Sequence, residues 1–245
     1  MSEQRDKNLW IFNAGNSFAG NPKWMFEYII RHHKEIKPVW MCYNADTMNY
    51  VHKLGYEAEL YHSSKGKSVM AKAGVYVVEM CKEVFQPELS GITVLNLWHG
   101  VGCKSIERKV TDGFLQERIA KKYIQNNDIL RNNQLFLVTS EIMEKHFKEQ
   151  CGIDDDKVIR AGYPRCVVND DIQSYDHDIR KKKGLSANTK LAIYCPTYRD
   201  NNGANFMKSA LPDMKRLADV LHENNILLIL KMHPMVEKDT QYLAM

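Results

Sequence analysis

Long hydrophobic runs are missing from this sequence. The apolar stretch from Ile226 to Leu230 has only five residues, whereas a helix that crosses a membrane needs about 20. The first seven residues are polar and of mixed charge, unlike a signal peptide or a transit peptide. These absences predict a cytoplasmic protein.

The motifs of several common sites are also missing. The chain has no G-x-G-x-x-G and no Walker A loop, which disfavours a dinucleotide site and a P-loop site. It has no G-x-S-x-G and no H-E-x-x-H motif, which disfavours the corresponding hydrolases and metalloproteases. No C-x-x-C pair occurs, so neither a disulfide scaffold nor a zinc site is expected from the six cysteines, Cys42, Cys81, Cys103, Cys151, Cys166 and Cys195.

A strong charge of one sign is lacking too. The formal net charge is +4, which is too small to indicate nucleic acid, and we expect none as a partner. This charge suits an anionic substrate and an anionic membrane face equally well. A hydrophobic fraction of 44% and a charged fraction of 26% are ordinary for a globular protein. The 245 residues are enough for one large domain or two domains of ordinary size.

What the sequence does contain is an alternation of short apolar runs with amphipathic segments. This alternation predicts an α/β fold with parallel strands and helices on both faces of the sheet. Asn21 and Pro22 predict the start of the first helix, with Asn21 as N-cap and Pro22 in the first turn. Strands are expected at residues 8–13, 38–42, 58–61, 74–78, 92–97, 134–138 and 158–161, and further helices at residues 44–54, 65–72, 114–126 and 140–148.

The composition changes in the last third of the chain. Residues 169–184 are highly charged, so we place a domain boundary here and expect domains at residues 1–168 and 169–245. The elements expected after it are a strand at 190–195, an amphipathic helix interrupted or started at Pro212, and a strand at 226–231. One βαβ unit is too little sheet for an independent domain, so the second domain is expected to be truncated.

The stretch from Asn96 to Lys104 carries the clearest chemical signal. It places His99, Gly100 and Lys104 just beyond a predicted strand, where ligands bind in open α/β sheets. Histidine can shuttle a proton near neutral pH, glycine lets the backbone approach a ligand, and a lysine can balance a phosphate charge. Taken alone, this stretch fits a strand-ending turn with a core histidine slightly better.

A second histidine and two arginines occupy similar positions. His233 follows the strand at 226–231, and Arg165 and Arg199 follow two other predicted strands. Because the guanidinium fork binds two phosphate oxygens at once, these residues and Lys104 together predict a site for a phosphorylated ligand. Each residue alone has a structural explanation, and the prediction depends on the two halves facing each other across a cleft.

Five motifs in this order resemble the CDP-glycerol glycerophosphotransferase family, the teichoic-acid primases and polymerases. They are GNPK at 20–23, LWHG at 97–100 with Lys104, GYPR at 162–165, PTYRD at 196–200 and KMHP at 231–234. The resemblance covers nearly the whole chain. The chain departs from the family at residues 101–103, where Thr-Pro is usual, and at Tyr198, where Trp is common. A later Asp-Tyr-Ser-type segment is absent.

The resemblance implies a GT-B-like fold of two Rossmann-like domains, an acceptor domain at 1–168 and the start of a donor-binding domain at 169–245. It implies transfer of glycerol phosphate from CDP-glycerol to a hydroxyl of a polyol-phosphate polymer or a lipid-linked acceptor, with release of CMP. Such an acceptor implies peripheral attachment to the inner face of the plasma membrane. Three lysines could add an electrostatic patch, although a solvated helix is the simpler account of them: Lys65, Lys67 and Lys72.

The resemblance also implies roles for single residues. His99 would be the general base, and His233 the second catalytic residue, which also binds the diphosphate. The substrate-binding residues would be Arg165, Arg199, Thr197, Lys104 and Gly100, with Asn21 and Lys23 towards the acceptor. These positive charges can neutralise the diphosphate, so we expect no metal and no cofactor. Two alternatives remain open, a GT-B nucleotide-sugar glycosyltransferase and a non-catalytic nucleotide-binding fragment.

Overall fold

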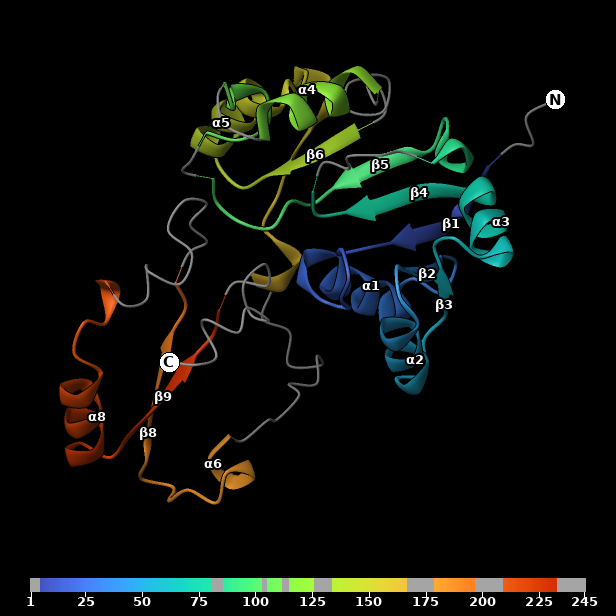
Figure 1. The fold of residues 1–245 in the computed structure, drawn as a ribbon. Coiled ribbons are helices and arrows are strands. Elements are labelled where there is room, and N and C mark those ends of the chain that lie inside the picture. Colours follow the sequence, from blue (N-terminus) through green and yellow to red (C-terminus); the bar gives the residue numbers. More distant parts are fainter. Residues whose placement is uncertain are drawn as a thin grey trace. The chain divides into compact units, whose positions relative to one another are not determined.

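The structure is a computed structural model, shown in Figure 1, that describes residues 5–80, 86–102, 105–111, 115–125, 134–166, 179–196 and 209–232. Its internal contacts divide the chain into two compact units, Met1–Ile172 and Gln173–Met245. The predicted boundary between residues 168 and 169 and the limit between these units both lie outside the described residues.

The first unit is built on one seven-stranded sheet in the order β3-β2-β1-β4-β5-β6-β7. Every neighbouring pair of strands is parallel, as predicted. The strand order reverses between β1 and β4, and ligands of open α/β sheets bind beyond the strand ends at such a point. The strands are β1 Asp6–Phe12, β2 Lys37–Cys42, β3 Ala58–Leu60, β4 Ala73–Val78, β5 Thr93–Asn96, β6 Gln134–Val138 and β7 Val158–Arg160.

Helices cover both faces of this sheet (Figure 1), which confirms the predicted layering. Side chains of a strand point alternately to opposite faces, so Leu137 of β6 joins one core cluster while Phe136 and Val138 join another. The helices α1 Gly20–His32 and α2 Ala45–Lys53 pack on the first face, and α3 Ser64–Lys72 and α5 Glu141–Cys151 pack on the second. The other helical segments are α4 Leu115–Gln125, η1 Pro87–Leu89, η2 Glu107–Lys109, η4 Asp155–Lys157 and η5 Pro164–Cys166.

The start of α1 differs from the prediction in one respect. Pro22 lies in the first turn as expected, but the N-cap is Ala19 and Asn21 is inside the helix. The acceptor that a cap side chain would supply comes instead from Glu79, whose Oε2 accepts a hydrogen bond from the Asn21 main-chain N–H at 3.2 Å. A residue 58 positions away in sequence therefore replaces the local cap.

The second unit contains one parallel strand pair, β8 Lys190–Tyr194 and β9 Ile226–Leu230, among its described residues. The helix α8 Met214–Glu223 connects the two strands, which confirms the predicted βαβ unit. Pro212 precedes α8, and Asp213 caps the helix by accepting a hydrogen bond from the Arg216 N–H at 2.8 Å. The charged run before β8 includes the short helix α6 Ile179–Lys182.

Two further features bear on the sequence predictions. Within the described ranges, no helix is both long enough and apolar enough to cross a lipid bilayer. The described cysteines are free thiols, of which Cys42 and Cys151 are buried while Cys166 and Cys195 are exposed.

Candidate functional site

His99 lies on the turn that follows β5, which we call the β5 turn (residues 97–100), and its side chain is exposed. Its Nδ1 is 2.8 Å from the main-chain oxygen of Glu79, the first residue after β4. Because a carbonyl oxygen can only accept, Nδ1 carries the proton and Nε2 of the neutral ring keeps its lone pair. Nε2 has no hydrogen-bond partner among the described residues. The ring can therefore accept a proton from a bound ligand.

The residue before it, Trp98, gives the turn its sharp bend. Its backbone is in the left-handed region, with φ of 51°, which costs about 1–2 kcal/mol at a residue other than glycine. Its indole is buried against Phe136 and Phe147, with ring centroids 5.6 and 5.3 Å away. The same indole stacks on the His99 imidazole at 4.4 Å. The bend thus buries Trp98 and exposes its neighbour.

Arg165 reaches the same turn from η5, beyond the end of β7. Its guanidinium donates a hydrogen bond to the main-chain oxygen of His99, with 2.5 Å between the two atoms. The side chain is exposed, and it lies 5.7 Å from the centroid of the Tyr163 ring. A guanidinium has five N–H donors, so it can bind an anion while it keeps this contact. An exposed cation and an exposed imidazole are therefore adjacent at the carboxyl edge of the sheet.

Tyr163 ties η5 to the β5 turn a second time. Its hydroxyl donates to the main-chain oxygen of Gly100 at 2.8 Å. Burial is the main cause that raises the pKa of Tyr163, so the hydroxyl remains protonated and available as a donor at neutral pH. Gly100 itself is close to the guanidinium, because a Cβ at this position would lie 3.4 Å from the Arg165 side chain.

Four of the site residues predicted from the sequence lie together here: Asn21, His99, Gly100 and Arg165. Asn21 contacts the β5 turn and Arg165, although its side chain is fully buried. Lys23 is also on α1, but its ammonium pairs with Glu27 at 3.9 Å and lies over the Trp24 ring at 5.0 Å. Four other predicted site residues lie outside the described residues: Lys104, Thr197, Arg199 and His233.

The sequence analysis assigned no individual role to two residues of the site. Glu79 accepts hydrogen bonds from the His99 ring and from the Asn21 N–H at the start of α1. Asn96 accepts a hydrogen bond from the main-chain N–H of Trp98, the residue at the bend. A signal for Glu79 was present, because it directly follows the predicted strand at 74–78 and so lies at the same sheet edge as His99. A signal for Asn96 was its place as a polar residue at the end of an otherwise apolar strand.

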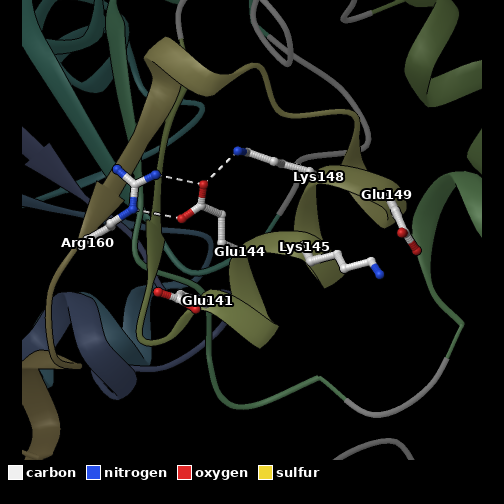
Figure 2. A pocket seen from close by; sticks show the side chains of 6 residues that line it. All are labelled: Glu141, Glu144, Lys145, Lys148, Glu149 and Arg160. Atoms are coloured by element: carbon white, nitrogen blue, oxygen red, sulfur yellow. Dashed lines mark hydrogen bonds and ion pairs between the residues drawn. The ribbon is translucent and has the colours of Figure 1, made fainter.

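A second candidate is a hollow lined by α5 and by Arg160 at the end of β7, which is shown in Figure 2. Its lining has three acidic and three basic residues, which gives no preference for an anion. Glu144 accepts two hydrogen bonds from Arg160, both at 2.7 Å, and one from Lys148 at 2.6 Å. Hydrogen bonds from Lys148 and then Arg160 lower the pKa of Glu144. The acidic and basic side chains that line this hollow therefore neutralise one another, and we call them the ion-pair cluster of α5.

An apolar cavity of about 500 Å³ lies between α1 and strands β5 to β7. Trp24 and Tyr28 line it from the helix, and Leu137 and Ile159 line it from the sheet. No charged side chain lines it, so it offers nothing that would bind a diphosphate. Nor do the described residues contain a group of three or more His, Cys, Asp or Glu side chains that could hold a metal ion.

A sequence model of the family described as CDP-Glycerol:Poly(glycerophosphate) glycerophosphotransferase matches residues 1–244. The chain belongs to this family. The five motifs that suggested the glycerophosphotransferase family were therefore interpreted correctly.

Relatives and solved structures agree with this assignment. The teichoic acid poly(glycerol phosphate) polymerase of Bacillus subtilis (strain 168) is 24% identical over 92% of this chain and 31% of its own length. The teichoic acid glycerol-phosphate primase of Bacillus spizizenii is 26% identical over 61% of this chain and 38% of its own length. A structure of the wall teichoic acid polymerase TagF, a variant soaked with CDPG, matches with a TM-score of 0.73 and 19% identity. That match covers 95% of this chain and 58% of the TagF chain.

Two conclusions follow from these comparisons. The fold is α/β and GT-B-like, as the sequence predicted. The chain spans only about a third of the length of the two relatives, and somewhat more than half of the TagF chain.

Proposed function

We propose that this protein transfers glycerol phosphate from CDP-glycerol to a hydroxyl group of a poly(glycerol phosphate) chain or a lipid-linked acceptor, and releases CMP. Membership of the glycerophosphotransferase family supports the reaction, and the TagF variant soaked with CDPG supports the donor. The observation that carries the proposal is the contact between His99 and Arg165. The exposed imidazole belongs to the β5 turn, and the exposed guanidinium donates a hydrogen bond to the main-chain oxygen of the same histidine.

His99 is the general base in this proposal. The acceptor hydroxyl gives its proton to Nε2 while its oxygen forms a bond to the β-phosphorus of CDP-glycerol. The bond from this phosphorus to the bridging oxygen breaks, and CMP leaves with that oxygen. The hydrogen bond from Nδ1 to the Glu79 carbonyl keeps the ring in the tautomer that this step requires.

Arg165 is the proposed phosphate ligand of the first unit. Its exposed guanidinium can bind diphosphate oxygens and stabilise the charge that develops on them. We propose that four residues outside the described ones complete the donor site, and that Lys23 and Gly100 contribute from α1 and the β5 turn. The four are Lys104, Thr197, Arg199 and His233. In this arrangement arginine, lysine and histidine neutralise the diphosphate.

The test is CMP release from CDP-glycerol in the presence of a lipid-linked acceptor. Removal of a general base lowers turnover by about 10²–10⁴-fold, so we expect His99→Ala to lower it by at least the smaller factor. His52→Ala is a matched control, because His52 is also exposed and also places a ring nitrogen on a main-chain oxygen, that of Ala58, at 3.0 Å. Near wild-type turnover in His99→Ala would show that this histidine is not the base.

A donor panel separates the remaining functions. Consumption of a nucleotide sugar in place of CDP-glycerol would assign the protein to the GT-B glycosyltransferases. Calorimetric binding of CDP-glycerol without any CMP release would indicate a nucleotide-binding role alone. Consumption of CDP-ribitol at a similar rate would widen the donor class to CDP-polyols.

We also propose peripheral attachment to the inner membrane face, where a lipid-linked acceptor would be presented. Two lysines of α3 contribute little to it, because Lys65 pairs with Glu59 and Lys67 lies 3.8 Å from Glu88. We therefore expect weak and salt-sensitive flotation with anionic vesicles. Absence of flotation at low ionic strength would contradict the attachment.

A further inference from the structure

The main-chain polar groups of Trp98 are held by two buried asparagines. Asn96 accepts a hydrogen bond from the Trp98 N–H through Oδ1, at 2.9 Å. Asn21 donates from Nδ2 to the Trp98 main-chain oxygen at 2.7 Å. Both asparagine side chains have no exposed surface. The left-handed residue of the β5 turn is therefore clamped on both sides, and we call this pair the asparagine clamp.

Asn21 also reaches the other residues around His99. Its Oδ1 accepts a hydrogen bond from the Arg165 main-chain N–H at 3.3 Å. Its own N–H donates to the carboxylate of Glu79, whose main-chain oxygen binds the His99 ring. One buried side chain and its backbone thus connect the β5 turn, η5 and the end of β4.

Asn96 is fixed from the other side of the turn. Its Nδ2 donates to Oε1 of Gln134 on the neighbouring strand β6, at 3.0 Å, and Gln134 is buried too. Because the amide of Asn96 donates to Gln134, its oxygen is oriented towards the Trp98 N–H. The clamp is therefore anchored in the sheet, and a rigid sheet can fix the direction of the turn.

We propose that Asn21 and Asn96 are positioning residues: together they hold Trp98 in the left-handed conformation and so fix the His99 imidazole beside Arg165. The proposal assigns Asn21 a role different from the substrate contact predicted from the sequence, because its side chain is buried and bonded to the protein. It rests on the proposed function only where His99 is said to act as the base.

The first test reads the His99 ring without any substrate. In protein labelled with ¹⁵N-histidine, long-range ¹H–¹⁵N spectra distinguish the two neutral tautomers, and His99→Gln identifies the relevant signals. We expect the Nδ1–H tautomer in the wild type and a mixture of tautomers in Asn21→Ala. Asn96→Ala gives the same reading if Asn21→Ala does not fold.

A matched control comes from Asn13 at the end of β1. It is equally buried, and its Nδ2 donates to the main-chain oxygens of Met41 and Gly15 at 2.8 and 3.1 Å. These two acceptors lie in the loop after β1 and in β2, and not in the β5 turn. We expect Asn13→Ala to destabilise the protein comparably while the His99 signals stay as in the wild type. The positioning role is wrong if Asn21→Ala and Asn96→Ala leave those signals unchanged, or if Asn13→Ala alters them equally.

The second test is the kinetics of CMP release. A misplaced catalytic group costs about 10²-fold in rate, so we expect a loss of that order in kcat for Asn21→Ala and little change in KM for CDP-glycerol. A rise in KM with kcat intact would instead make Asn21 a substrate-binding residue and overturn the proposal. If His99→Ala retains turnover while the tautomer changes as expected, the positioning role stands and the base assignment fails.

Discussion

Gly20 provides a stringent check on the architecture of the site. It is the first residue of α1, and its φ is 69°, in the region that residues with a Cβ rarely adopt. A Cβ built on it would lie 1.9 Å from Oε2 of Glu79 and 2.6 Å from the carboxyl carbon. Gly20→Ala must therefore displace the carboxylate that binds the Asn21 N–H, in addition to straining the backbone.

The expected loss of stability has two parts. Alanine in the left-handed region costs about 1–2 kcal/mol, and a hydrogen bond to a charged group contributes about 1.5–3 kcal/mol. Because Glu79 is partly exposed, we take the lower part of the second range. We therefore expect Gly20→Ala to lower the free energy of unfolding by about 3 kcal/mol, measured by urea denaturation at neutral pH.

Gly55 supplies a matched control for the backbone part. Its φ is 80°, and a Cβ there would have no atom within 4 Å. Gly55→Ala should therefore cost only about 1–2 kcal/mol. The excess cost at Gly20 should disappear in a Glu79→Ala background, where the carboxylate is gone. Equal losses for the two glycines, or an excess that persists without Glu79, would refute this account of the α1 start.

Two further predictions concern the β5 turn and the ion-pair cluster of α5. Tyr163→Phe removes the hydrogen bond to the β5 turn, so we expect it to lower the free energy of unfolding by about 1 kcal/mol and to slow CMP release. Tyr28 is exposed, and Tyr28→Phe should change neither quantity. Equal effects of the two substitutions would contradict the role of the Tyr163 hydroxyl. Lys148 and Arg160 lower the pKa of Glu144. Its ion pairs therefore stabilise the fold fully at pH values above the ordinary Glu pKa of 4.5, and this stabilisation is lost as the pH falls through the lowered pKa. The stability difference between wild type and Glu144→Gln in urea denaturation should therefore shrink from pH 6 to pH 3, and a constant difference would contradict this linkage.

The secondary structure was largely predictable because its signals are local. Short apolar runs indicated the strands, and the helix expected at residues 140–148 begins where Ser140 accepts a hydrogen bond from the Met143 N–H. The interruption at Pro212 followed from the missing N–H of proline. The order of the strands in the sheet did not follow, because periodicity carries no information on which parallel strands are neighbours.

The site was predictable to the extent that strand ends determine it. His99 and Arg165 were expected at the same edge because each follows a parallel strand, and the structure places them in contact. Asn21 was misread as a cap, because its side-chain partners lie 76 to 144 positions away in the sequence. Glu79 was overlooked for a similar reason: it serves His99 through a main-chain oxygen, which its residue type does not reveal.

The carboxylate at the start of α1 has a consequence for how this sheet meets an anion. In dinucleotide-binding sheets of the same strand order, the main-chain N–H groups at the N-terminus of the first helix bind the pyrophosphate, and the helix dipole favours its negative charge. Here a glutamate of the protein already occupies one of those amides. The first helix thus acts as an internal brace. In the proposed function the diphosphate is therefore bound by side-chain cations, and we expect this binding to weaken as salt is added.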